Sequence, residues 1–372
     1  DKNMIIEFEC PKEILMENLL IVQKAVAMKS AVPQLECFYI EAKSNKITVI
    51  GNNYEISIKT EFNAETESEG KILINARNFF DMVRLMPSGD VRISADDDYK
   101  VEIKNNRTKY ETIGMSTEAF PMNEDTQFSY SFKIKEKNLK ELIKKTYFSV
   151  GNDDKNPTFK GALFEVKEDN LKVVTTDTFR MSLINEEIVN ECGEYSFIIP
   201  GKSLNDLLKI MGESEEEMEV SFSEKNALMK LRNIEFSTRL IEGEFLNYAH
   251  FIPNESKIKV YVDTKTLSES LERCALIVTP DAREHVKMTV TDNKIELLTV
   301  SRVGKIEDCV DAVKTGDDIE VGFNYKFVLD ALKSIEEDRV SLNFTNNLSP
   351  CIIKCDDNDS FTYLVVPVRL RD

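Results

Sequence analysis

The feature that most constrains the fold of this 372-residue chain is a pattern that occurs three times. Each copy reads as a short strand and an amphipathic helix, then strands, a strand that leads into a second helix, and more strands. The first landmark, 125 and 123 residues apart, is the asparagine that opens an alternating strand: Asn45, Asn170 and Asn293. The second landmark, 125 and 124 residues apart, lies in the strand before the second helix: Ile74, Ile199 and Phe323. This ordered series predicts a triplicated domain.

The triplication predicts three domains, at 1–125, 126–254 and 255–372, because matching turns end near Asp125 and Asn254. Each copy holds two helices and more strand than helix, which is an α+β architecture built in layers. The joints between the copies are short, so we expect the domains to pack in a row.

The distribution of charge separates the predicted helices from the rest of the chain. With 48 basic and 66 acidic side chains the formal net charge is −18, which argues against a simple nucleic-acid-binding protein. The formal charges of the six predicted helices sum to +6, and those of the remaining residues sum to −24. The predicted helices are 12–29, 75–86, 136–148, 201–212, 264–278 and 324–335. A lysine face is usually only solvated. A positive layer shared by all copies would also suit sequence-independent contact with phosphates, and charge alone leaves both interpretations open.

The residues of common catalytic sites are almost missing. The two histidines, His250 and His285, lie in unrelated contexts, and no phosphate-binding glycine motif occurs. Cys351 and Cys355 are four residues apart, which fits one face of a strand better than half of a metal site. We expect no catalytic residues, no metal and no cofactor. An enzyme using scattered carboxylates is disfavoured because no pair of acids repeats across the copies.

The expected location is the cytoplasm. Seven cysteines scattered through a large chain are typical of reduced thiols. No run of 18 apolar residues occurs, and the first ten residues lack the pattern of a signal peptide. We therefore expect no membrane contact.

Several segments resemble the bacterial DNA polymerase III beta subunits, the DNA sliding clamps, over essentially the full length of the chain. They are MIIEFECPKEIL, ILINARNFFDMVRLMPSG, VVTTDTFRMSL, FIIPGKSLNDLLKIM, VGFNYKFVLDAL and YLVVPVRL. The resemblance implies a head-to-tail homodimer whose six domains form a ring, with helices lining the hole and antiparallel sheets outside. Such a ring encircles duplex DNA without reading sequence, is opened by a clamp loader, and tethers the replicative polymerase without catalysing a reaction.

The resemblance also implies a pocket for QLxLF-like peptides of the polymerase and of repair proteins. Matched by motif, its residues are Phe159, Thr176, Thr178, Phe179, Arg180, Met181, Leu246, His250, Phe251, Phe327, Leu348, Val365, Val366, Pro367, Val368 and Arg369. Four of these depart from the family pattern: Thr178 and Phe179 replace glycine and histidine, His250 replaces arginine, and Val366 replaces methionine. We expect the pocket to stay apolar but to differ in the peptide it prefers.

Two further surfaces follow from the resemblance. The DNA-facing candidates are Lys29, Lys137, Lys140 and Lys144. The subunit-interface candidates are Lys100, Arg107, Lys109, Tyr110 and Thr112 in the first domain and Leu276, Ile277, Glu307 and Asp308 in the third. Arg302 and Lys305 stand where the family tends to have glutamates, which weakens the acidic side of that interface. The alternative function is therefore a diverged clamp paralogue that binds peptides without stable ring closure, and its mass in solution would distinguish it.

Overall fold

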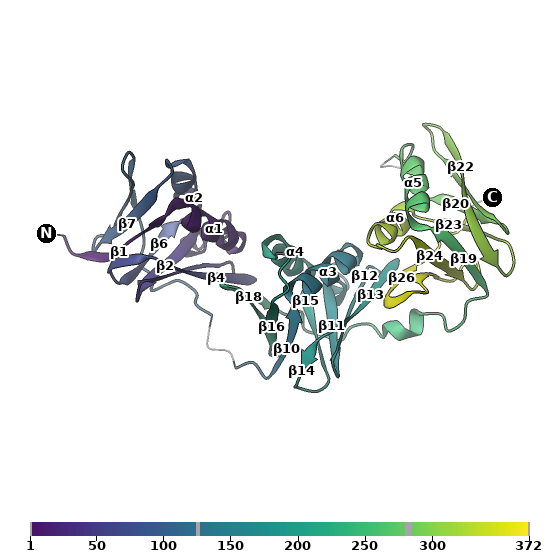
Figure 1. Ribbon diagram of the computed structural model, residues 1–372, viewed down its shortest axis with the longest axis horizontal. Coiled ribbons are helices and arrows are strands. Elements are labelled where there is room, and N and C mark those ends of the chain that lie inside the picture. The colour runs from purple at the N-terminus through teal and green to yellow at the C-terminus, as the bar shows by residue number, and fades with distance from the viewer. Residues whose placement is uncertain (1, 124–126, 280–284, 371–372) are drawn as a thin grey trace. The chain divides into compact units, whose positions relative to one another are not determined.

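The computed structural model of the chain describes residues 2–123, 127–279 and 285–370 (Figure 1). Its contacts divide into two compact units. The first unit comprises Asp1–Lys137 and Asn205–Leu240, and the second comprises Asn138–Leu204 and Ile241–Asp372. The central repeat contributes to both units. The predicted boundary at Asp125 lies outside the described residues, and the three domain ranges stay predictions.

The first unit is built from antiparallel strands with two helices packed together on them (Figure 1). Its elements are β1 (Met4–Pro11), α1 (Lys12–Val22), β2 (Cys37–Lys43), β3 (Lys46–Asn52), β4 (Ile56–Asn63), β5 (Glu65–Ser68), β6 (Gly70–Asn75), α2 (Ala76–Leu85), β7 (Asp90–Asp96), β8 (Lys100–Lys104), β9 (Lys109–Ile113), β10 (Tyr130–Lys135), β16 (Glu217–Phe222), β17 (Asn226–Leu231) and β18 (Ile234–Arg239). One sheet has the order β5-β1-β7-β8-β9, and a second runs β10-β16-β17-β18-β4-β3-β2-β6. The β18–β4 pair makes the central and first repeats share this second sheet.

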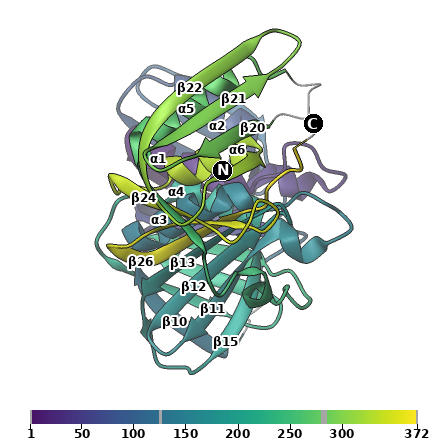
Figure 2. The ribbon, with the colours of Figure 1, turned by 90° about the vertical axis from the view of Figure 1, so that its right-hand side faces the viewer.

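The second unit is organised around one long antiparallel sheet. Two helices are divided between the units: α3 (Glu136–Thr146) begins in the first unit and α4 (Gly201–Ile210) ends in it. The other elements are β11 (Gly161–Lys167), β12 (Asn170–Thr176), β13 (Arg180–Glu187), β14 (Val189–Asn190), β15 (Tyr195–Pro200), β19 (Ile258–Asp263), α5 (Thr264–Ala275), β20 (Val286–Val290), β21 (Lys294–Val300), β22 (Lys305–Thr315), β23 (Ile319–Phe323), α6 (Tyr325–Lys333), β24 (Arg339–Phe344), β25 (Cys351–Cys355) and β26 (Asn358–Val365). The strand order is β15-β11-β12-β13-β26-β25-β24-β19-β22-β21-β20-β23. Figure 2 shows β26 beside β13, where the central and third repeats join.

Local chemistry explains why the helices follow the strands directly. Asn75, at the end of β6, accepts a hydrogen bond from the N–H of Asn78, and Asn324 caps α6 in the same way from its place after β23. Such side-chain caps satisfy a helix N–H that has no partner within the helix. Because the same residue caps the second helix in the first and third repeats, the predicted repeat is visible in the details of its structure.

Helix α1 is shorter than predicted, because it ends at Val22 and is followed by a single 3₁₀ turn at Gln23–Ala25. Lys24 and Lys29 therefore lie outside the helix, and the net charge of the helices in the described chain is +4 rather than +6. The apolar spacing continues past the helix end because Ala25 is also buried. The positive layer is consequently concentrated on the central repeat, where α3 carries +2.

Two smaller expectations concern the thiols and the membrane. Cys351 and Cys355 are both buried on β25, which confirms the strand interpretation of their spacing. Among the described residues, helices that combine the length and the apolar character needed to cross a membrane are absent.

Candidate functional site

The strand pair β13–β26 brings together two segments that are far apart in the sequence. Arg180 pairs with Val365, and Met181 with Leu364. Just beyond the last pair, the Val366 N–H donates to the carbonyl oxygen of Phe179 at 2.9 Å. The TTDTFRM and LVVPVRL segments therefore lie side by side in the second unit, as the predicted partner site requires.

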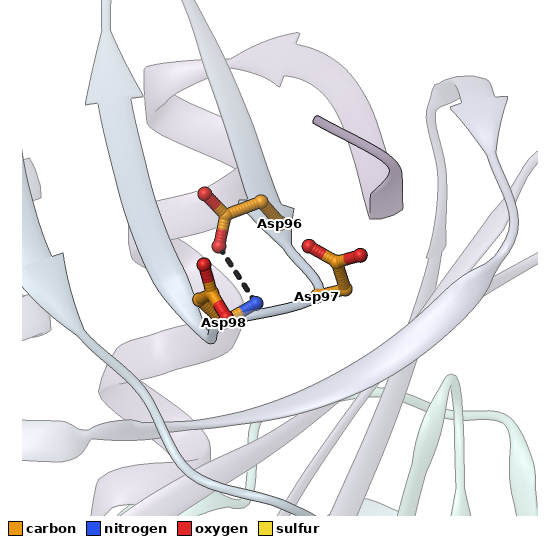
Figure 3. Close-up of side chains that lie close together, drawn as sticks. All are labelled: Asp96, Asp97 and Asp98. Atoms are coloured by element: carbon orange, nitrogen blue, oxygen red, sulfur yellow. Dashed lines mark hydrogen bonds between the residues drawn. The ribbon is translucent and has the colours of Figure 1, made fainter. Parts of the chain in front are cut away.

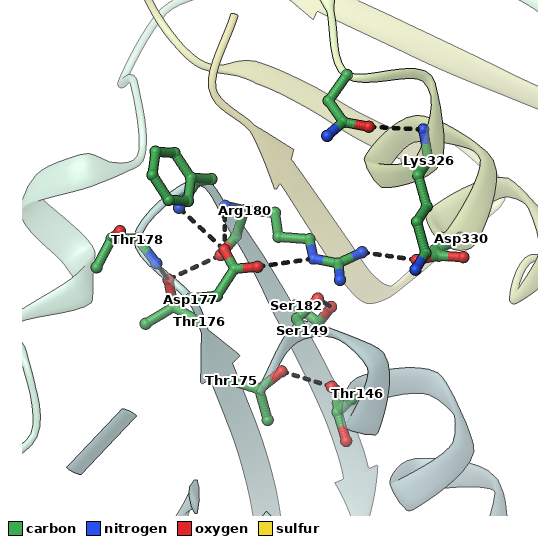
Figure 4. A network of polar contacts seen from close by, with 12 residues as sticks. Thr146, Ser149, Thr175, Thr176, Asp177, Thr178, Arg180, Ser182, Lys326 and Asp330 are labelled. Carbon is green, nitrogen blue, oxygen red and sulfur yellow. Dashed lines mark hydrogen bonds and ion pairs between the residues drawn. The ribbon is translucent and has the colours of Figure 1, made fainter. Parts of the chain in front are cut away.

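A tight turn before β13 determines which side chains of the first segment reach the surface (Figure 4). The Asp177 carboxylate accepts hydrogen bonds from the N–H groups of Phe179 and Arg180, both at 3.0 Å. The Thr176 hydroxyl accepts from the N–H of Thr178 and donates to the Arg180 carbonyl oxygen. Thr178 has φ = 77°, a left-handed conformation that is costly for a β-branched residue and free of strain for glycine. The turn leaves Phe179 61% exposed.

An apolar cluster lies beneath these segments. Its buried members are Leu163, Val174, Met181, Leu183, Ile198, Ile352 and Leu364, and Val366 packs against it with Ile241, Phe245, Tyr248 and Ile252. Two predicted site residues, Met181 and Val366, therefore share one cluster. Thr176, Met181 and Val365 are buried, so they support the surface from below.

The connection between the central and third repeats crosses the same cluster. Tyr248 donates a hydrogen bond to the Glu165 carboxylate, and the ammonium of Lys172 lies 5.9 Å from the centre of the Tyr248 ring. Burial together with the Glu165 carboxylate raises the pKa of Tyr248, so its hydroxyl stays a donor. The rings of Phe159 and Phe245 meet edge to face at 5.9 Å. This anchoring holds the connection in place while leaving its predicted site residues half-buried or exposed: Leu246, His250 and Phe251.

The guanidinium of Arg180 pairs with two carboxylates of the protein (Figure 4). It donates to Asp177 at 3.1 Å and to Asp330 of α6 at 2.7 Å. It also stacks near two rings, 4.4 Å from the centre of Phe327 and 5.7 Å from that of Phe148. The sequence prediction included Arg180 and Phe327 but missed Phe148, Asp330, Phe245 and Tyr248. It also missed Asp177, although Asp177 and Asp330 both stand inside segments that carry the resemblance, VVTTDTFRMSL and VGFNYKFVLDAL.

The remaining predicted partner residues belong to the same unit. Leu348 is exposed in the loop between β24 and β25, Pro367 and Val368 are half-buried, and Arg369 is exposed. The Val368 N–H donates to the Gly322 carbonyl oxygen at 2.9 Å, which fixes the segment after β26 against β23. We define the partner surface as Phe179, Phe251, Leu348, Val366 and Pro367 with the cluster below them.

The interface candidates of the first repeat lie on and beside β9, the edge strand of its sheet. Lys109 pairs with Glu102 at 3.0 Å and with Glu111 at 3.1 Å, and these hydrogen bonds raise the pKa of Lys109. Lys100 also pairs with Glu111, at 3.7 Å. Tyr110 and Thr112 are half-buried and Arg107 is exposed, in the turn before the strand. Ile113, which the prediction missed, is 69% exposed at the strand's end.

The interface candidates of the third repeat surround a second open edge. Residues 305–311 of β22 pair with β21, whereas β19 pairs only with residues 312–315. Leu276 is 79% exposed at the end of α5, and Val300 and Val303 are exposed nearby along the β21–β22 turn. Ile277 lies close to Gly304 of that turn.

The two predicted acidic residues of this edge already have partners within the chain. Asp308 accepts hydrogen bonds from Arg273 and Ser270, both at 2.7 Å, and Glu307 pairs with Lys305 at 2.6 Å. Burial opposes ionisation of Asp308, but the Ser270 and Arg273 hydrogen bonds outweigh it and lower its pKa. The electrostatic attraction available to another chain is therefore weaker than a count of acids indicates.

The DNA-facing candidates occupy two places. Lys137, Lys140 and Lys144 follow one another on α3 at helical spacing, with Lys137 paired to Glu215 at 3.3 Å and Lys144 to Glu141 at 3.7 Å. Lys29 is exposed in the loop after the 3₁₀ turn that ends α1.

Three consecutive carboxylates, Asp96, Asp97 and Asp98, lie within 4.8 Å of one another (Figure 3). Asp96 accepts hydrogen bonds from the N–H groups of Asp98 and Lys100, each at 3.0 Å, and pairs with Lys2 at 3.2 Å. The Lys100 N–H and Lys2 lower the pKa of Asp96. The three aspartates therefore lie together because Asp96 holds the backbone of the β7–β8 turn through these hydrogen bonds.

Comparison with known proteins identifies the family of the chain. Three family models match consecutive parts of the chain: the DNA polymerase III beta subunit N-terminal domain over residues 6–124, the central domain over 133–247 and the C-terminal domain over 249–369. The beta sliding clamp of Halalkalibacterium halodurans is 29% identical and is covered over 99% of its length by 97% of this chain. A DNA polymerase sliding clamp from Bacillus subtilis superposes with a TM-score of 0.96 at 26% identity, and a DNA polymerase III beta subunit from Thermotoga maritima with 0.90 at 28%. Both alignments cover 98% of this chain and 100% of the other. The chain therefore belongs to the DNA polymerase III beta subunit family, the bacterial DNA sliding clamps.

Proposed function

We propose that two copies of this chain close head to tail into a ring around double-stranded DNA. As a sliding clamp the chain is a non-catalytic processivity factor of the polymerase holoenzyme. In the proposal a clamp loader opens the ring in the cytoplasm, and the polymerase and repair proteins bind through QLxLF-like peptides. The ring keeps its partners on DNA by topology, so its own contacts with DNA can be weak and independent of sequence.

The observation that carries ring closure is the pair of open strand edges. Within the described part of the chain, β9 has a neighbouring strand on one side only, and so do residues 305–311 of β22. Unpaired N–H and C=O groups along an edge favour pairing with another strand. The two edges differ in sequence and belong to different repeats, so a contact between them is heterologous and closes a ring when the rotation fits. Exposed apolar side chains at both edges would be buried by this contact: Ile113, Leu276, Val300 and Val303.

The partner surface supports the peptide-binding part of the proposal. Phe179, Phe251 and Leu348 are large apolar side chains that are at least half exposed. Phe179 lies beside Val366, while Phe251 and Leu348 shortly precede Ile252 and Ile352 of the apolar cluster. Exposed apolar side chains that gather on one surface usually mark a binding site. Leucine and phenylalanine anchors of a peptide would bury against them and against Val366, and such anchors dominate peptide binding.

The lysines of α3 are expected to carry the contact with DNA. Replacing Lys140 and Lys144 by glutamate should shorten the retention of the ring on circular DNA, because two cations near the phosphates become anions. The salt dependence should also become shallower, with the slope of log K against log salt smaller by roughly two. Retention is measured by gel filtration of loaded plasmid over a series of salt concentrations.

A matched control is the variant with Lys167→Glu and Lys230→Glu, which makes the same change of charge on β11 and β17. This variant should keep the wild-type retention. Equal losses in both variants would mean that total charge, rather than the α3 face, governs retention.

A further inference from the structure

Four groups surround the Arg180 guanidinium, and they come equally from the central and third repeats. Asp177 and Phe148 belong to the central repeat, whereas Asp330 and Phe327 belong to α6 of the third. The Arg180 side chain is only 11% exposed, and that of Asp330 is 24% exposed. Arg180 therefore links the two repeats at the point where the strand pair β13–β26 ends. We call the contacts of Arg180 with these four residues the Arg180 tie.

We propose that Arg180 is a positioning residue of the partner surface, which acts by holding the two repeats in register rather than by contacting the peptide. The inference rests on the proposed peptide-binding function. The partner surface needs groups from both repeats, since Phe179 comes from one and Val366 from the other. The Phe179 carbonyl oxygen accepts the Val366 N–H at 2.9 Å, immediately beside the Arg180–Val365 pair.

The geometry explains why a direct contact is disfavoured. The Nε of Arg180 donates to Asp177 at 3.1 Å and Nη1 donates to Asp330 at 2.7 Å. A bidentate contact with a peptide carboxylate uses two neighbouring guanidinium nitrogens, so it would include Nε or Nη1 and compete with Asp177 or Asp330. Either displacement leaves a half-buried carboxylate without its partner, which is costly. The guanidinium also lies over the rings of Phe327 and Phe148, an arrangement that suits arginine better than lysine.

The tie also orients Phe327, because its ring lies 4.4 Å from the guanidinium carbon. Asp330 is one helical turn after Phe327 on α6, so the ion pair and the ring contact hold the same face of that helix. Loss of either contact would let α6 shift relative to Phe179 and Val366.

The test measures the affinity of a labelled QLxLF-type peptide, once with a free carboxyl terminus and once amidated. The variants are Asp330→Asn, Arg180→Lys and the double variant, with Asp357→Asn as a control that removes an exposed carboxylate of the same repeat. We expect Asp330→Asn and Arg180→Lys each to weaken both peptides by about tenfold or more. The double variant should be no weaker than the worse single variant, because both changes break one tie. The control should bind as the wild type does.

A direct peptide contact predicts a different result. Asp330→Asn would then free the guanidinium and leave affinity unchanged or increased, and Arg180→Lys would affect the free-acid peptide more than the amidated one. Either outcome overturns the positioning role. A wild-type protein that binds neither peptide would instead refute the proposed partner surface. Thermal unfolding and solution mass identify a variant that fails to fold. If either Arg180→Lys or Asp330→Asn fails to fold, the other variant still tests the same tie.

Discussion

Val366→Asp is expected to abolish binding of a leucine- and phenylalanine-bearing peptide while leaving the fold intact. Val366 packs at the edge of the apolar cluster and is only half-buried, so in the free protein the new carboxylate can reach water. A bound peptide would cover it. A covered carboxylate must lose its hydration or take up a proton, and protonation at pH 7 costs about 4 kcal/mol for an ordinary aspartate. The expected loss of affinity is therefore at least about 100-fold.

The pH dependence separates this mechanism from a simple loss of shape. At pH 5 the cost of protonating the aspartate falls to about 1.5 kcal/mol, so the variant should regain much of its affinity. Val366→Asn places a polar group of the same size there and should show a smaller loss that does not change between pH 7 and pH 5. Val189→Asp, at an exposed valine of β14, should bind like the wild type. Fluorescence anisotropy with a labelled peptide gives all of these values, and equal affinities of Val366→Asp and wild type would refute the assigned surface.

Much of the fold could be predicted because burial follows the period of each element. The repeated asparagines mark the starts of β3, β12 and β21, and the strand–helix landmarks lie in β6, β15 and β23. In each case alternation along a strand or helical spacing after it encodes which face is buried. The end of α1 was predicted wrongly because Ala25 is buried in a 3₁₀ turn, which keeps the apolar spacing without continuing the helix.

The candidate site was less predictable, since its contacts join residues that are far apart in the chain. Arg180 and Asp330 are 150 residues apart, and local patterns contain no information on which strands become neighbours. The resemblance indicated Arg180 and Val365, but a motif does not reveal that the guanidinium is already occupied. The open edges of the sheets could not be predicted from the sequence either. β9 alternates between exposed and half-buried residues, as a strand with neighbours on both sides does.

Leu276→Asp is expected to convert the ring to monomers at micromolar concentration. Leu276 is 79% exposed at the end of α5, so the change should alter the stability of the single chain very little. In a closed ring the side chain would face the apolar end of β9, and burial of a carboxylate there carries the same penalty of about 4 kcal/mol at pH 7. The penalty occurs at both interfaces of the ring. Asp308 and Glu307 of this edge already pair with basic residues of their own chain. Little electrostatic attraction between the two chains therefore remains to offset the penalty.

Sedimentation analysis gives the mass of the wild type, of Leu276→Asp and of Leu20→Asp, a control at an exposed leucine of α1. The wild type and the control should be dimers, and Leu276→Asp a monomer that no longer stays on circular DNA. Because the partner surface lies within one unit of one chain, the monomer should still bind the labelled peptide with wild-type affinity. A dimeric Leu276→Asp would place the interface elsewhere. A wild type that is itself monomeric would identify the chain as the diverged paralogue, in which the peptide-binding function persists without ring closure.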